Sequence, residues 1–266
     1  MVALGKIKVR GNMQISRRTK FSLSQLLAVV EKPTVYVLFE KFGLDPQLVS
    51  SPAGISEQII SSSEDFVSDL LIELIHTNRT LRNQTNPIQS NPKYKFDDQY
   101  FILKKSLLLD GYKVEDQAIE ALDPNFKGHE PVEDALLKEL DNSLLQNTIG
   151  IAQSVKASAE DFVKAQPDYN GSLTNIRIAL ETLIREIAFS KGFTTSRSGN
   201  TWGPSLAYLK SNDFIDQQEE QALSSVFTFV SNGAHVPLGF SHEEFVRLGR
   251  NLCSSMCYFV VKKYNV

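Results

Sequence analysis

Cysteine and long apolar runs are scarce in this 266-residue sequence. No stretch approaches the roughly 20 consecutive apolar residues that a membrane-spanning helix needs, so we expect no membrane partner. Its two cysteines, Cys253 and Cys257, are four residues apart in an apolar run, a spacing at which a disulfide along one helix is geometrically poor. We expect both to be buried apolar side chains. Residues 1–20 contain no apolar segment of signal-peptide length, and we therefore expect a cytoplasmic protein.

The short motifs of the common cofactor and metal enzymes are also missing. The chain has no glycine-rich phosphate loop ending in Gly-Lys-Ser or Gly-Lys-Thr, no dinucleotide fingerprint and no Gly-x-Ser-x-Gly. It has no His-x-x-x-His pair, and its four histidines, His76, His129, His235 and His242, are too scattered for the sequence alone to bring them together. We therefore expect no cofactor and no bound metal.

A strong excess of charge of either sign is absent as well. Lys and Arg number 28 against 31 Asp and Glu, a formal net charge of -3. This balance argues against a surface that neutralises nucleic-acid phosphates over its whole extent, so any RNA contact must be local. The apolar share of 42% is ordinary for a folded protein, and the chain is long enough for two domains of ordinary size.

What the sequence does contain is a series of helical patterns, divided by a segment rich in proline, glycine and charge. This segment, "DPNFKGHEPVED", spans residues 123–134, and such composition is typical of a boundary between domains. We expect a basic arm over residues 1–20, a mainly helical N-terminal domain over 21–130 and a four-helix domain over 131–266. The predicted fold class is all-α with one small β-hairpin.

Local signals place the elements of the N-terminal domain. Two helices are expected from Ser22 onward, separated at Lys32-Pro33 because proline fits the first turn of a helix but not its interior. Ser63 is the expected N-cap of a long helix, because acidic residues and an apolar periodic pattern follow it. Two short strands, "YKVE" and "AIEAL", flank the predicted turn at Asp116-Gln117.

The C-terminal domain is expected to consist of four main helices. The first is predicted over Val132–Ala165, and the second follows Ser172 as its cap and ends at Gly192. The third leads into Ser231-Asn232-Gly233-Ala234-His235. The fourth begins with a capping box between Ser241 and Glu244.

One face of the second helix carries charges at a spacing of four: Arg177, Glu181 and Arg185. Residues four apart lie on the same side of a helix, so these side chains can form a row of ion pairs. One interpretation is a solvated helix face worth a few tenths of a kcal/mol per pair. The other is that the arginines bind an RNA phosphate or a partner carboxylate near His235.

Four stretches of the C-terminal half carry a resemblance to a known family. They are "YNGSLTNIRIALETLIREIA", "TWGPSLAYLK", "VFTFVSNGAH" and "EEFVRLGRNLCSSMCYFVVKKY". Together they resemble the HEPN superfamily of four-helix domains, in the versions found in bacterial abortive-infection and defence proteins. The resemblance implies a homodimer, and for many members a metal-independent ribonuclease whose arginine holds the scissile phosphate and whose histidine takes part in proton transfer.

His235 matches the family's histidine, and the resemblance gives Asn232, Arg177 and Glu181 supporting places in the site. The family's arginine is absent, because Thr228, Phe229 and Val230 occupy its permitted positions. Arg177 is the candidate to replace it from the neighbouring helix. An alternative for His235 is a structural role at the end of the third helix, with Gly233 at a positive φ.

Two functional hypotheses follow from the resemblance. The first is an RNA-engaging effector or component of a bacterial anti-phage defence or toxin system, with metal-independent endoribonuclease activity as its catalytic form. The second is a catalytically inactive HEPN-like module for dimerisation and protein interaction, in which the N-terminal domain recognises a protein partner.

Overall fold

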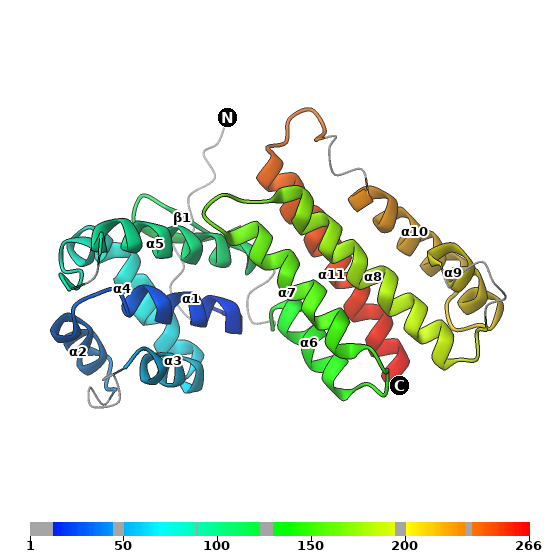
Figure 1. The fold of residues 1–266 in the computed structure, drawn as a ribbon, viewed down its shortest axis with the longest axis horizontal. Helices are drawn as coiled ribbons and strands as arrows, with labels where there is room; N and C mark the ends of the chain where they lie inside the picture. The colour runs from blue at the N-terminus through cyan, green and yellow to red at the C-terminus, as the bar shows by residue number, and fades with distance from the viewer. Residues whose placement is uncertain (1–12, 45–50, 89, 123–129, 195–200, 232–235) are drawn as a thin grey trace, which may run out of the picture. The chain divides into compact units, whose positions relative to one another are not determined.

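The computed structural model describes residues 13–44, 51–88, 90–122, 130–194, 201–231 and 236–266. Within these residues the chain forms eleven helices and one two-stranded antiparallel hairpin, which confirms the expected all-α class with a small β-hairpin (Figure 1). The chain divides into two compact units, Met1–Pro131 and Val132–Val266. We call them unit 1 and unit 2.

Unit 1 is built around its first helix. Its elements are α1 (Arg17–Leu27), α2 (Lys32–Lys41), α3 (Pro52–Ser61), α4 (Glu64–Asn83), α5 (Pro92–Leu109), β1 (Tyr112–Glu115) and β2 (Ala118–Ala121). Helix α1 packs against α3 and α5, with Leu23, Leu26 and Leu27 fully buried. The expected start signals are present, because Pro33 lies in the first turn of α2 and the Ser63 side chain accepts a hydrogen bond from the Phe66 amide.

The hairpin has its turn at the predicted position, Asp116-Gln117. Val114 of β1 pairs with Ile119 of β2, and the two turn residues, Asp116 and Gln117, have positive φ angles of 47° and 61°. A two-residue turn of this kind needs positive φ at both positions, because its twist then matches that of the strands. Tyr112 and Ile119 are buried and attach the hairpin to the core of unit 1.

The N-terminal segment departs from the expected basic arm over residues 1–20. Helix α1 begins at Arg17 rather than at Ser22, and Met13 and Ile15 are buried in the core. The segment has too few residues for a clear apolar period, so its burial leaves no local signal in the sequence. From Met13 onward it is an integral part of unit 1.

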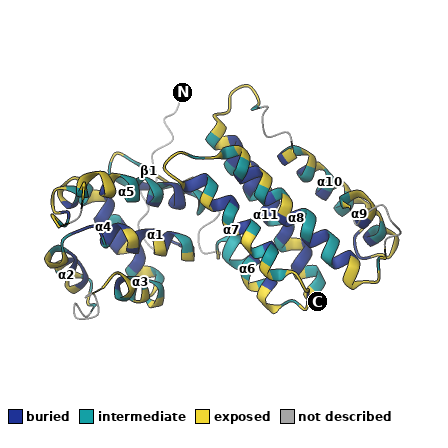
Figure 2. Ribbon diagram, in the orientation of Figure 1, coloured by how far each residue is buried: buried dark blue, intermediate teal, exposed yellow. Residues whose placement is uncertain are grey.

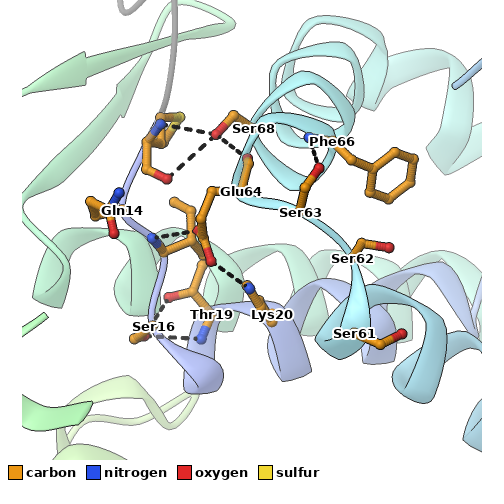
Figure 3. A network of polar contacts seen from close by, with 12 residues as sticks. Gln14, Ser16, Thr19, Lys20, Ser61, Ser62, Ser63, Glu64, Phe66 and Ser68 are labelled. Carbon is orange, nitrogen blue, oxygen red and sulfur yellow. Dashed lines mark hydrogen bonds and ion pairs between the residues drawn. The ribbon is translucent and has the colours of Figure 1, made fainter. Parts of the chain in front are cut away.

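Four successive main-chain amides of this segment donate hydrogen bonds to side chains that are distant in sequence, and Figure 3 shows the two that go to Ser68 and Glu64. The four are Met13 to Ser68 Oγ (3.0 Å), Gln14 to the Tyr112 hydroxyl (3.1 Å), Ile15 to Glu64 Oε2 (3.3 Å) and Ser16 to Asp110 Oδ2 (3.0 Å). The other oxygen of Glu64 accepts from Lys20 Nζ at 2.6 Å. A buried amide without an acceptor is costly, so these contacts allow the extended segment to be buried.

Unit 2 is organised around α8. Its elements are α6 (Val132–Asn142), α7 (Thr148–Val163), α8 (Tyr169–Ser190), α9 (Trp202–Ser211), α10 (Gln217–Ser231) and α11 (His242–Asn265). Helix α8 contacts α7, α9, α10 and α11, and Figure 2 shows buried residues along its length. The capping box between Ser241 and Glu244 is present at the start of α11, as predicted.

Two helix boundaries predicted for unit 2 were wrong. The helix expected over Val132–Ala165 is interrupted at residues 143–147, where the Ser143 amide and hydroxyl both donate to the Leu140 carbonyl and end α6. Leu144 continued the apolar period in the sequence, yet it is 91% exposed. The second helix begins at Tyr169 with Asp168 as its cap, whereas the predicted cap, Ser172, is fully buried within α8.

A buried polar cluster joins four helices of unit 2. Arg250 of α11 donates from Nε to Ser158 Oγ of α7 at 3.0 Å, and from Nη2 to Glu133 of α6. Ser158 and Ser172 each donate a hydroxyl to the other's carbonyl, at 2.8 and 2.7 Å, and so join α7 to α8. The Arg250 and Glu133 side chains are only 3% and 14% exposed. A cation buried this deeply needs its carboxylate partner.

Both cysteines are buried and free, as expected. The Cys253 thiol donates to the Ile176 carbonyl of α8 at 3.4 Å. A hydrogen bond with Cys253, together with burial, raises the pKa of the Cys257 thiol well above its ordinary value. Among the described helices, none has both the length and the apolar composition of a membrane span.

Candidate functional site

Arg177 lies on the side of α8 that faces α10. Its sequence neighbour Ile176 and the next-turn residue Leu180 are fully buried, so helical geometry leaves Arg177 half-buried at the edge of the interface. Its guanidinium carbon lies 5.6 Å from the centroid of the Phe227 ring of α10, close enough for a cation–π interaction. Among the described residues, no carboxylate forms an ion pair with Arg177.

Glu181 forms an ion pair with only one of the two arginines in the predicted row. Its carboxylate lies 3.7 Å from Arg185, one turn further along α8, and both side chains are partly exposed. An exposed pair at this spacing is worth a few tenths of a kcal/mol. The charged face predicted from the sequence is therefore divided, because Glu181 and Arg185 pair on the surface while the Arg177 guanidinium lies beside Phe227.

An aromatic pair adjoins Arg177. Trp202, the first residue of α9, stacks on Phe227 with ring centroids 4.2 Å apart and planes 10° from parallel. Both rings are half-buried, and the Trp202 indole N–H has no hydrogen-bond acceptor among the described residues. We call Trp202 and Phe227 the aromatic platform. Phe227 gave no functional signal in the sequence, because it fits the apolar period of α10.

The last turns of α10 are closely packed against α8 and α11. A Cβ placed on Gly249 of α11 would lie 3.0 Å from Leu173 Cδ2 of α8 and 3.3 Å from Val230 Cγ1 of α10. Only glycine allows the three helices to approach this closely without a shift. Since Val230 is the penultimate residue of α10, this packing fixes the position from which the chain continues toward His235.

His235 and Asn232 themselves lie outside the described residues. Of the four site residues predicted from the sequence, the structure therefore places Arg177 and Glu181. Phe227, the residue that Arg177 contacts, is one helical turn before Ser231. The guanidinium is consequently held beside the turn of α10 that precedes Asn232.

A second group of titratable side chains lies where α8 and α11 begin. The exposed imidazole of His242 stacks on Tyr169, with centroids 6.4 Å apart and planes 11° from parallel. The Tyr169 hydroxyl donates to Glu243 Oε2 at 3.2 Å, and burial raises the pKa of Tyr169. Tyr169 precedes Arg177 by two turns of α8, so sequence spacing had given no reason to join His242 to this part of the bundle.

Chemically, the arrangement around Arg177 suits a ligand that is both anionic and planar. A guanidinium offers a fixed fork of N–H donors to phosphate or carboxylate oxygens, and an aromatic face attracts a flat ring. Within the described part of the chain, no group of three or more His, Cys, Asp or Glu residues is arranged to hold a metal ion. No family model, curated protein or solved structure matches the chain.

Proposed function

We propose that unit 2 is a HEPN-like domain that engages RNA, and that the protein is a cytoplasmic effector or component of a bacterial anti-phage defence or toxin system. The observation that supports this proposal is the position of Arg177. Its guanidinium has no ion-pair partner among the described residues and lies beside Phe227, one turn before α10 ends. RNA would bind with a phosphate at Arg177 and with the adjacent backbone near His235.

Arg177 has the properties that phosphate recognition requires. Arginine stays protonated at any physiological pH and binds phosphate oxygens through two parallel hydrogen bonds. The contact with Phe227 restricts the side chain before the ligand arrives, so less conformational entropy is lost on binding. In this proposal Arg177 supplies from α8 the charge that the family supplies from the end of the third helix.

In the catalytic form of the proposal, His235 takes the proton of a ribose 2′-hydroxyl. The 2′ oxygen attacks the adjacent phosphorus and the bond from phosphorus to the 5′ oxygen breaks. The 5′ oxygen leaves with a proton from solvent, so the products carry a 2′,3′-cyclic phosphate and a 5′-hydroxyl. Arg177 stabilises the charge on the phosphoryl oxygens, and Asn232 orients the phosphate. Glu181, one turn after Arg177 on α8, does not touch the phosphate and adds a negative charge near the guanidinium.

The test compares the purified full chain with single variants on mixed tRNA and mRNA and on a labelled single-stranded RNA. Arg177→Ala should weaken RNA binding at least tenfold, and Arg177→Lys should recover part of it because the charge returns without the fork. Arg185→Ala, on the same helix but paired with Glu181, is the matched control and should bind like the wild type. Equal RNA affinity of the wild type and Arg177→Ala would overturn the proposal.

The same set of variants separates binding from catalysis. If the domain cleaves RNA, His235→Ala should abolish the 2′,3′-cyclic product while RNA affinity stays within about twofold of the wild type. Binding without any cleavage by the wild type would leave an RNA-engaging domain and exclude the catalytic form. Thermal unfolding of each variant checks that the loss is not a loss of fold.

A second candidate function is favoured by the outer face of α11. Leu248, Leu252 and Phe259 are exposed, and their spacing places them on one side of the helix. Phe259 also lines an open pocket of about 250 Å³, together with Gln218, Glu219, Ala222 and Met256. Such a face is typical of a dimerisation or protein-interaction module, the inactive alternative in which unit 1 would recognise a protein partner.

The oligomeric state tests this second candidate. Light scattering at micromolar concentration should give the mass of a homodimer for the wild type and of a monomer for Leu252→Glu, which places a charge in the centre of the face. A monomeric wild type with normal helical content would exclude dimerisation through α11. The RNA-binding proposal does not depend on that result.

A further inference from the structure

We infer that Trp202 is a base-stacking platform for single-stranded RNA, and that the same bound strand has a phosphate at Arg177. The inference rests on the proposed RNA-binding function and extends it from one phosphate contact to the class of substrate. It is carried by the aromatic platform, by the position of the guanidinium on the same ring, and by the surroundings of Trp202.

The aromatic platform holds the indole in a fixed orientation. Trp202 lies parallel to Phe227 with centroids 4.2 Å apart, so one face of the indole is supported by a second ring. A base added to the stack would meet a plane that is already ordered, and little further side-chain entropy would be lost. Base–aromatic stacking in single-strand-binding proteins is sequence-tolerant, because every base presents a flat π surface.

The surroundings of Trp202 leave part of the indole accessible. The flanking residues Thr201, Gly203 and Pro204 are exposed, and Trp202 itself is only partly covered. A Cβ placed on Gly203 would meet no atom within 4 Å, so open space adjoins the residue that follows the indole.

Arg177 adds a phosphate-binding group next to the aromatic platform. Phe227 is contacted by the guanidinium, at 5.6 Å from its centroid, and by the indole, at 4.2 Å. The guanidinium and the indole therefore both neighbour the Phe227 ring, so a phosphate-binding group and a stacking surface lie in the same part of unit 2. RNA is a ligand that can use both groups, because each nucleotide carries a flat base and an anionic phosphate.

The geometry also selects the single-stranded form. Bases in an A-form duplex are stacked on each other and paired, so a side chain cannot stack on an internal base without displacing its neighbours. An unpaired loop or a single strand offers its bases freely. The inferred substrate is therefore an unpaired segment of RNA rather than a helix.

Intrinsic fluorescence gives a direct test, because Trp202 is the single tryptophan of the chain. Titration of the full-length protein with a ten-nucleotide single-stranded RNA should quench its emission. The same RNA annealed to its complement should leave the emission nearly unchanged. Binding of labelled single-stranded RNA, measured by anisotropy, should weaken about five- to hundredfold in Trp202→Leu, as expected for the loss of one stacked base.

Trp202→Phe is the variant that guards against misfolding, since it keeps an aromatic ring on Phe227 and should retain RNA affinity within about fivefold. RNA binding that depends on Arg177 but proceeds without quenching, and with equal affinity in Trp202→Leu, would overturn the stacking inference and leave the proposed function intact. If the wild type binds no RNA by anisotropy, the proposed function and the stacking inference fail together.

Discussion

Both units bury ionised side chains, but for different structural purposes. In unit 1, Glu64 joins Lys20 to the main-chain amide of Ile15, and thereby holds an extended segment without secondary structure against α4. In unit 2, Arg250 joins the side chains of Glu133 and Ser158 and thereby fixes three helices relative to one another. The first cluster fastens a piece of backbone, and the second sets the packing of a bundle.

The depth of the two clusters also differs. The Lys20 and Glu64 side chains are 10% and 34% exposed, whereas Arg250 and Glu133 are 3% and 14% exposed. Water screens a charge more effectively where the side chain is more exposed. Removing one partner of the ion pair should therefore be more destabilising in unit 2 than in unit 1.

The largest effect is expected for Arg250→Met. The substitution leaves Glu133 with its main cationic partner removed and the buried Ser158 hydroxyl without its donor, and breaking a buried ion pair costs about 3–5 kcal/mol. Urea unfolding of the full chain, followed by circular dichroism, should show an earlier transition for part of the helical signal. The double variant Arg250→Met with Glu133→Leu should recover much of the lost stability, because it removes both charges. A double variant as unstable as Arg250→Met alone would show that the unpaired charge of Glu133 is not the cause.

A smaller loss is expected for Glu64→Gln in unit 1. The amide oxygen can still accept from Ile15, but Lys20 loses its anionic partner, and the partial exposure of Glu64 limits the cost to about 1–2 kcal/mol. Hydrogen exchange of the amides of residues 13–16 should accelerate. Asp65→Asn, the exposed neighbour in the same helical turn, is the control and should leave those amides unchanged. A loss as large as that of Arg250→Met would remove the difference between the two clusters.

An exposed helix cap in unit 2 provides a contrast with the buried cluster around Arg250. Ser241 accepts from the Glu244 amide at 3.2 Å, and its own amide donates to the Glu244 carboxylate at 2.9 Å. Ser241→Ala should cost about 1 kcal/mol, the usual value for an N-cap. Faster exchange in the first turn of α11, with the amides near Arg250 unaffected, would show that local and buried contacts in unit 2 act separately. Uniform acceleration over the whole helix would contradict this.

The smallest effect is expected for an exposed ion pair of unit 1. A side-chain hydrogen bond from Arg82 holds the pKa of Asp97 below its ordinary value, although both side chains are nearly half exposed. A depressed carboxyl pKa adds stability above the unfolded value of about 3.9, and that stability is lost as the pH falls through the folded-state pKa. The wild type and Asp97→Asn should therefore differ slightly at pH 6, and the difference should shrink as the pH falls below the unfolded value. A difference that grows on acidification would have the wrong sign.

Local contacts account for what could be predicted from the sequence. The Ser63 cap, the capping box of α11 and the hairpin turn at Asp116-Gln117 each depend on residues within four positions of one another. Their chemistry is therefore visible in a short window of sequence.

The features that could not be predicted depend on distant parts of the chain. Arg250 donates a hydrogen bond to a glutamate 117 positions earlier. Ser172 was mistaken for a helix cap, because the sequence near it does not show that its hydroxyl bonds to Ser158 of α7. The same holds for the candidate site: the spacing from Arg177 to Glu181 was visible in the sequence, whereas the contact of Arg177 with Phe227, 50 positions later, was not. His235 and Asn232 remain predictions.

The two cysteines provide a way to follow unit 2 alone. Both thiols are buried in α11 and unit 1 contains none, while the raised pKa of Cys257 keeps its sulfur in the unreactive thiol form. A thiol reagent can therefore modify the native protein only after the bundle opens around α11. The labelling rate then measures how often unit 2 opens in an otherwise unaltered chain. It gives the free energy of that opening for unit 2 alone, because unit 1 has no thiol to react.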